Sequence, residues 1–74
     1  MKILLVEDNL DIVSNLTTLL SYNNYLVEYA TTIKEALKKL NKTYSLVILD
    51  ISLPDGLGTD LFLEIKKNYQ IPSI

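Results

Sequence analysis

The sequence predicts an α/β fold in which helices cover both faces of a doubly wound parallel sheet. Three short apolar runs, at 2–6, 25–30 and 46–49, have the length and composition of strands. Helix-type stretches separate these runs, so that strand and helix alternate three times. This alternation favours right-handed βαβ units, with the second strand beside the first and the third on its other side. The expected strand order is 2-1-3.

The first strand and helix are predicted within residues 2–24, with Asn23-Asn24 ending the helix. Lys2 to Val6 is an apolar run that ends in charge, and Asn9 or Asp11 can cap the helix that follows. The apolar residues of this helix recur on one side, as in an amphipathic helix packed against a sheet. The residues expected to face the sheet are Ile12, Val13, Leu16, Leu19 and Leu20.

The second strand and helix span residues 25–40. Tyr25 to Ala30 is predicted to be an edge strand, because Glu28 in its middle needs access to solvent. Thr32 and Glu35 have the spacing of a capping box at the start of a helix. The expected buried stripe of that helix consists of Ile33, Ala36, Leu37 and Leu40.

The third strand, Leu46 to Leu49, is apolar throughout and stops at the carboxylate of Asp50. Such a run is typical of a strand that is buried on both faces. Pro54, Gly56 and Gly58 follow within eight residues and predict a tight loop that keeps its backbone close to Asp50.

A third helix is expected to begin at Thr59 or Asp60 and to turn Leu61, Phe62 and Ile65 inward. Residues 70–74 then resemble the start of a fourth strand. The handedness of the βαβ units places the first helix on one face of the sheet and the second and third on the other.

Carboxylates follow two of the predicted strands directly. Glu7 and Asp8 follow the first strand, and Asp50 follows the third. Asp50 alone could merely cap a strand end, but adjacent parallel strands would bring all three acids to the crevice where the strand order reverses. Their mutual repulsion favours a cation. Because the chain has no histidine or cysteine, an oxygen-only site for Mg²⁺ is expected.

Two motifs of the chain resemble the receiver domain of two-component response regulators. The first is Glu7-Asp8-Asn9 after a strand, and the second is Leu46-Val47-Ile48-Leu49-Asp50 together with Leu53-Pro54-Asp55-Gly56-Leu57-Gly58. The resemblance covers the whole chain and implies a flavodoxin-like fold. The Leu-Pro-Asp-Gly-Leu-Gly run is most like the branch of transcription regulators that carry a winged-helix DNA-binding domain.

The resemblance implies a role for each acidic residue. Asp50 corresponds to the aspartate that a sensor histidine kinase phosphorylates in this family. Asp8 corresponds to a direct Mg²⁺ ligand, Glu7 to one that acts through water, and the backbone carbonyl of Ser52 to the remaining protein ligand. Such a domain is a phosphoacceptor and not an enzyme, apart from Mg²⁺-dependent self-phosphorylation and dephosphorylation.

The receiver family also uses a serine or threonine hydroxyl after its fourth strand and a lysine after its fifth. Residues 1–74 are therefore expected to form a truncated receiver domain, made of the first three βα units and the start of strand 4. The alternative function is a fragment that acts only as a folding or association unit and is not competent for efficient phosphorylation. We expect sheet surface beside Leu5 and Leu49 to stay open, and the chain to form a homo-oligomer through its exposed sheet edge.

Composition argues against several other classes. The net charge is −2 and the seven lysines are scattered, so direct contact with nucleic acid is not expected. Without cysteine there is neither a disulfide framework nor a thiolate site. The first apolar run is too short for a signal peptide or a membrane span, and the cytoplasm is the expected compartment.

Rival motifs are incomplete. Gly56-Leu57-Gly58 lacks the third glycine of a dinucleotide-binding fingerprint, and no P-loop sequence is present. Asp50-Ile51-Ser52 lacks the second aspartate of haloacid-dehalogenase-type phosphatases, the closest enzymatic alternative. Asp55 lies in the turn sequence Pro54-Asp55-Gly56, so its carboxylate is expected to bond local backbone and not a metal.

Overall fold

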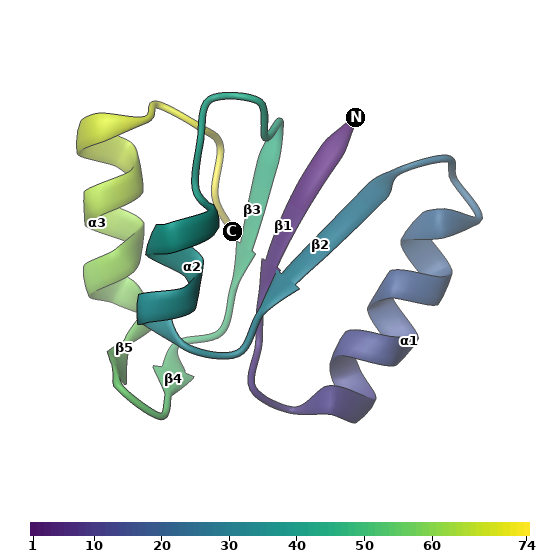
Figure 1. Cartoon of the computed structure of the whole chain (residues 1–74), viewed down its shortest axis with the longest axis horizontal. Helices are drawn as coiled ribbons and strands as arrows, with labels where there is room; N and C mark the ends of the chain where they lie inside the picture. Colours follow the sequence, from purple (N-terminus) through teal and green to yellow (C-terminus); the bar gives the residue numbers. More distant parts are fainter.

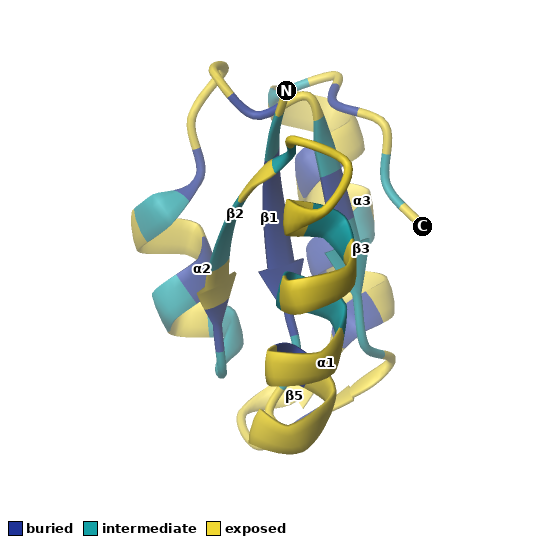
Figure 2. Cartoon of the chain, turned by 90° about the vertical axis from the view of Figure 1, so that its right-hand side faces the viewer, coloured by how far each residue is buried: buried dark blue, intermediate teal, exposed yellow.

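The protein, described by a computed structural model of residues 1–74, has three layers with a parallel sheet in the middle. The sheet has the order β2-β1-β3 and consists of β1 (Lys2–Val6), β2 (Leu26–Ala30) and β3 (Leu46–Leu49). α1 (Leu10–Ser21) covers one face, whereas α2 (Ile33–Lys39) and α3 (Gly58–Asn68) cover the other (Figures 1 and 2). The predicted strand order and the predicted placement of the helices are both confirmed.

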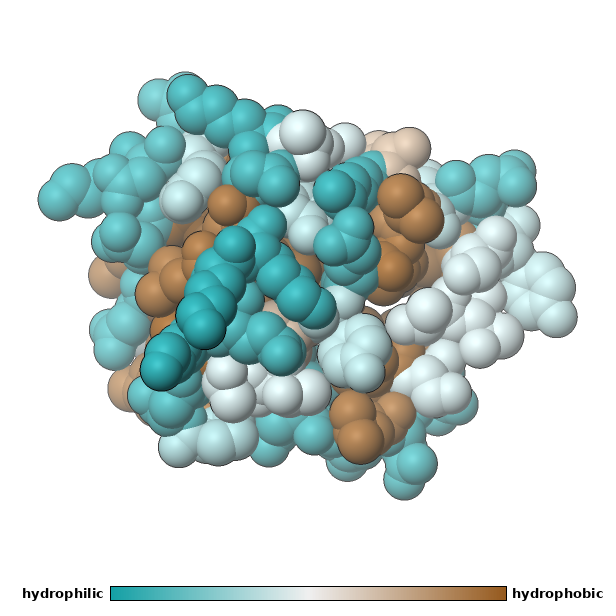
Figure 3. All heavy atoms as spheres, viewed as in Figure 1, coloured by the Kyte–Doolittle hydropathy of each residue, from teal (hydrophilic) through white to brown (hydrophobic).

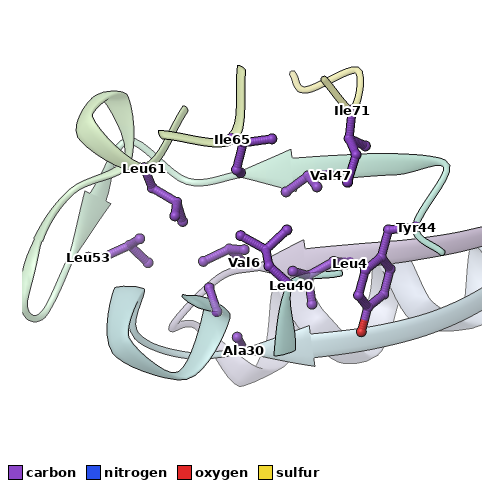
Figure 4. Packing of buried hydrophobic residues seen from close by; sticks show 11 residues of the cluster. Leu4, Val6, Ala30, Leu40, Tyr44, Val47, Leu53, Leu61, Ile65 and Ile71 are labelled. Carbon is purple, nitrogen blue, oxygen red and sulfur yellow. The ribbon is translucent and has the colours of Figure 1, made fainter. Parts of the chain in front are cut away.

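The central strand β1 is buried on both faces. Its residues alternate in direction, so that Ile3 and Leu5 lie on one face and Leu4 and Val6 on the other, and all four are at most 2% exposed. The main core lies on the side of α2 and α3 (Figure 4). It contains Leu4, Val6, Ala30, Ala36, Leu40, Tyr44, Val47, Leu53, Leu61, Ile65 and Ile71.

Helix α1 begins as predicted, because the side chain of Asn9 accepts hydrogen bonds from the backbone N–H groups of Asp11 and Ile12 at 3.0 and 3.3 Å. Its buried stripe is narrower than predicted. Val13 is buried, but Ile12 and Leu19 are 41% and 59% exposed. A single helix on a sheet covers only residues near its line of contact, and these two residues flank that line.

Helix α2 has the predicted cap. The Oγ1 of Thr32 accepts from the N–H of Glu35 at 3.0 Å, and the carboxylate of Glu35 accepts from the N–H of Thr31 at 2.8 Å. Ala36 and Leu40 are buried as predicted, but Leu37 is 44% exposed, which corrects its assignment to the core. The helix has only seven residues, and Leu37 follows Ala36 toward the solvent side.

The loop after Asp50 is a small antiparallel hairpin of β4 (Ser52–Leu53) and β5 (Gly56–Leu57). The sequence predicted a tight loop here but not a hairpin. Helix α3 then begins at Gly58, before Thr59 or Asp60, and has no side-chain cap. Leu61 and Ile65 are buried and Phe62 is half-buried, in agreement with the predicted inward face.

The outer edge of β3 is paired by the last residues of the chain. Val47 donates to the carbonyl of Pro72 at 3.0 Å, and Leu49 donates to the carbonyl of Ile74 at 2.7 Å. The sheet surface beside Leu5 and Leu49 was expected to stay open, but it is covered. Leu5 is only 2% exposed, and Leu49 packs against the main core. None of the helices has the length and apolar character needed to cross a membrane.

A polar cluster joins β1, β2 and the segment before β3. The carboxylate of Glu28 lies 3.3 Å from the Nζ of Lys2 and accepts a 2.9 Å hydrogen bond from the hydroxyl of Tyr44. Burial, and then the bond to Glu28, raise the pKa of Tyr44 to about 12, while the Tyr44 hydroxyl, followed by Lys2, lowers the pKa of Glu28. β2 is an edge strand as predicted, and Glu28 is only half-buried.

Candidate metal site

The backbone brings the acidic residues after β1 and β3 to the same edge of the sheet. The N–H of Glu7 donates to the carbonyl of Ala30 at 2.9 Å, and the N–H of Asp50 donates to the carbonyl of Val6 at 2.9 Å. These bonds continue the pairing of β1 with its two neighbours by one residue. All three strands end at this edge, where the β4–β5 hairpin also lies (Figure 1). The ends of β1 and β3 therefore meet at one edge of the sheet, as the strand order predicted.

Glu7, Asp8 and Asp50 converge as predicted. Each offers one carboxylate oxygen, and the three oxygens lie within 4.8 Å of one another. Glu7 and Asp50 are half-buried and Asp8 is exposed. Burial raises the pKa of Glu7, and the negative charge of Asp50 raises it further. The unfavourable charge of this cluster is what a bound divalent cation would neutralise, so the donor set fits Mg²⁺.

Main-chain donors hold two of the carboxylates in place. Glu7 Oε2 accepts from the N–H of Asn9 at 3.1 Å, and Asp50 Oδ1 accepts from the N–H of Ser52 at 3.3 Å. Ser52 is exposed and begins β4. It is thus attached to Asp50 through its backbone, and the role of its carbonyl as a metal ligand stays a prediction.

Gly58 explains why the chain turns back so tightly after Asp50. A Cβ at this position would lie 1.9 Å from the backbone oxygen of Asp50, so only glycine fits. The N–H of Gly58 also donates to the carbonyl of Ile51 at 2.7 Å. The predicted close backbone approach to Asp50 is confirmed, and Gly58 makes it possible.

Asp55 lies outside the acidic cluster, as predicted, but its hydrogen bonds differ from the expectation. Its carboxylate accepts from the backbone N–H groups of Ile33 and Lys34 at 2.8 and 3.0 Å. These donors belong to the first turn of α2, more than twenty residues away, and not to the local turn. No local signal in the sequence connects these two segments, so the contact could not be predicted from the sequence.

Comparison with known proteins adds to this geometry. Residues 3–74 match the family described as the response regulator receiver domain. The chain belongs to this family. The transcriptional regulatory protein CpxR homolog of Haemophilus influenzae is 41% identical over 71 residues, which are 96% of this chain and 31% of that protein. The recognition of a receiver domain is thereby confirmed, and the relative is a transcription regulator, as in the branch that the Leu-Pro-Asp-Gly-Leu-Gly run resembles.

Solved structures of receiver domains and response regulators have the same fold as this chain. The non-phosphorylated receiver domain of HemR from Leptospira biflexa has a TM-score of 0.87 at 40% identity, and the match covers 97% of this chain and 60% of that one. The response regulator TrrA of Thermotoga maritima, in complex with Mg²⁺-BeF, has a TM-score of 0.85 at 38% identity, with 93% and 61% covered. TrrA is also known in complex with the histidine kinase ThkA. The receiver-type, flavodoxin-like fold is confirmed, and this chain spans about three fifths of these domains.

Proposed function

We propose that this chain acts as a phosphoacceptor in two-component signalling, with Asp50 as the residue that receives the phosphoryl group. The observation that carries the proposal is the convergence of Glu7, Asp8 and Asp50 at the carboxyl edge of a receiver-type sheet. Asp8, Asp50 and the carbonyl of Ser52 would hold Mg²⁺ directly, and Glu7 would contribute through water.

The proposed reaction is a transfer between two side chains. A carboxylate oxygen of Asp50 attacks the phosphorus of a phosphohistidine, and the new O–P bond forms as the N–P bond breaks and the imidazole leaves. The N–H of Ser52 fixes one oxygen of Asp50 for this attack. Mg²⁺, when bound, supplies positive charge that offsets the charge of the transferring group.

The same proposal names the partner and the setting. A sensor histidine kinase as phosphodonor is supported by the complex of TrrA with the kinase ThkA. Control of transcription by a DNA-binding part of a longer protein is supported by the CpxR homolog, of which this chain spans 31%. This role implies a cytoplasmic protein, and the chain itself serves as a phosphorylated signalling domain and not as an enzyme.

Incubation with a small phosphodonor and Mg²⁺, followed by intact mass and peptide mapping, tests the assignment of Asp50. We expect slow labelling that requires Mg²⁺, maps to Asp50 and is lost in Asp50→Asn, because the 74 residues lack the further hydroxyl and lysine that the family uses. Equal labelling of Asp50→Asn would overturn the phosphoacceptor assignment. Rapid, complete labelling would show that those further groups contribute little.

A second candidate function is association of copies of this chain through the outer edge of the sheet. Residues 72–74 pair with β3 on one side, and no strand pairs with them on the other. Ile74 itself is 75% exposed, and Ile51, which follows β3 after Asp50, is 67% exposed. Elsewhere, on the face drawn in Figure 3, hydrophobic residues reach the surface in separate groups. We expect sedimentation at micromolar concentration to show a dimer, and a monomer would contradict this proposal.

A further inference from the structure

The β4–β5 hairpin is attached to the rest of the chain at two places. At its base, the N–H of Ser52 donates to Asp50 and the N–H of Gly58 donates to the carbonyl of Ile51. At its tip, both carboxylate oxygens of Asp55 accept hydrogen bonds from the start of α2. Apart from Leu53 and the tip contact, the hairpin residues are exposed. Two-residue strands are too short to be stable alone, so the attachments determine where the hairpin lies.

The tip contact completes a chain of bonds that runs around the acidic cluster. Glu7 is bonded through its N–H to Ala30 at the end of β2, and the next residues lead directly into α2. The first turn of α2 is bonded to Asp55, and the hairpin returns from Asp55 to Asp50. The two segments that carry the acidic cluster are therefore connected twice, once through the sheet and once through Asp55.

We infer that Asp55 is a positioning residue for the acidic site, which holds the β4–β5 hairpin and hence the Ser52 carbonyl where Asp8 and Asp50 can share a cation with it. This inference rests on the proposed function. Asp55 touches neither the cluster nor the space between its carboxylates, so it acts only through the hairpin.

The chemistry of Asp55 suits this role. A carboxylate can accept from two adjacent N–H groups at once, and its charge is favourable beside the free N–H groups of a first helical turn. The two bonds to Ile33 and Lys34 lower the pKa of Asp55, so its carboxylate stays ionised to a lower pH than that of an ordinary aspartate. An amide at this position offers only one good acceptor, and a methyl group offers none.

Titration of this chain with Mg²⁺, followed by NMR, tests the inference on four variants. Asp55→Ala removes both carboxylate oxygens that accept hydrogen bonds from α2, and Asp55→Asn leaves one acceptor oxygen. Asp60→Asn removes the same charge from an exposed side chain in the first turn of α3 that forms no hydrogen bond with α2. Asp8→Ala removes a proposed metal ligand. Mutating a residue that hydrogen-bonds directly to a metal ligand typically weakens metal binding roughly 10- to 100-fold. Asp55 acts one step further away, so we expect Asp55→Ala to bind Mg²⁺ about three- to tenfold more weakly. The effect should be smaller for Asp55→Asn and absent for Asp60→Asn.

Thermal unfolding without Mg²⁺, measured on the same samples, separates positioning from stability. If Asp55→Ala lowers the melting temperature but binds Mg²⁺ as tightly as the unmodified chain while folded, Asp55 is only structural and the inference is wrong. If Asp55→Ala does not fold, the comparison of Asp55→Asn with Asp60→Asn decides in the same way. If Asp8→Ala binds Mg²⁺ normally, the proposed metal site itself is wrong, and the inference is overturned with it.

Discussion

Gly58 lies so close to the backbone carbonyl of Asp50 that a Cβ on Gly58 would be 1.9 Å from that oxygen. A rigid carbonyl cannot move away without displacing the phosphoacceptor candidate itself. We therefore predict that Gly58→Ala lowers the free energy of unfolding by at least about 2 kcal/mol, as measured by urea denaturation. Gly56→Ala is the control. Its Cβ would meet only the end of the Ile33 side chain at 2.9 Å, although at a strained positive φ, so its loss is expected to be smaller.

The polar cluster at the opposite end of the sheet gives a second prediction. Tyr44→Phe removes the hydroxyl that donates to Glu28 but leaves Glu28 paired with Lys2. We expect a loss of about 1 kcal/mol in the free energy of unfolding at pH 7, because no buried charge is left without a partner. A loss above about 3 kcal/mol would indicate that Lys2 does not compensate.

The raised pKa of Tyr44 gives a prediction for how the free energy of unfolding changes at alkaline pH. Its pKa rises from an ordinary value of 10.0 to about 12, so the folded chain holds this proton more tightly than the unfolded chain. Stability should therefore fall as the pH rises from about 10 to about 12, by on the order of 2 kcal/mol from this group. Denaturation series of the unmodified chain and Tyr44→Phe check this, since lysine titration is common to both. Parallel curves would contradict the assignment.

Two helix residues test which positions carry the core. Ile65 is fully buried in α3, whereas Leu37 in α2 is 44% exposed although its sequence spacing assigned it to the core. Ile65→Ala should cost about 2 to 5 kcal/mol, and Leu37→Ala less than about 1 kcal/mol. Similar losses in the two variants would restore Leu37 to the core.

The sequence predicted the sheet well because each strand carries its own signal. Val6 and Leu49 are each followed directly by an acid, and this fixes both the ends of β1 and β3 and the place where the acids meet. The caps at Asn9 and Thr32 are likewise local patterns, formed between residues two to four positions apart. For these elements the nearest neighbours in the sequence determine the structure.

The remaining features depend on contacts between distant segments. The bonds of Asp55 to α2 and the fit of Gly58 against Asp50 arise only after the hairpin has folded back. The exposure of Leu37 and Leu19 follows from how much of each helix the sheet can cover, and periodicity alone does not give that width. Helical spacing therefore predicted too many core residues. The turn sequence around Asp55 predicted local hydrogen bonds and not the bonds that Asp55 accepts from α2.

We propose that Asp8 and Asp50 form a Mg²⁺ site with Glu7 beside them. The most direct measurement is a Mg²⁺ titration of the unmodified chain, Asp8→Ala and, as a control for charge, Asp11→Ala, followed by NMR shifts of Asp50 and Ser52. We predict weak, saturable binding in the unmodified chain and in Asp11→Ala, and none in Asp8→Ala, because the cation needs clustered carboxylates. An unchanged titration in Asp8→Ala would show that Asp8 does not bind Mg²⁺ and would contradict the proposed site.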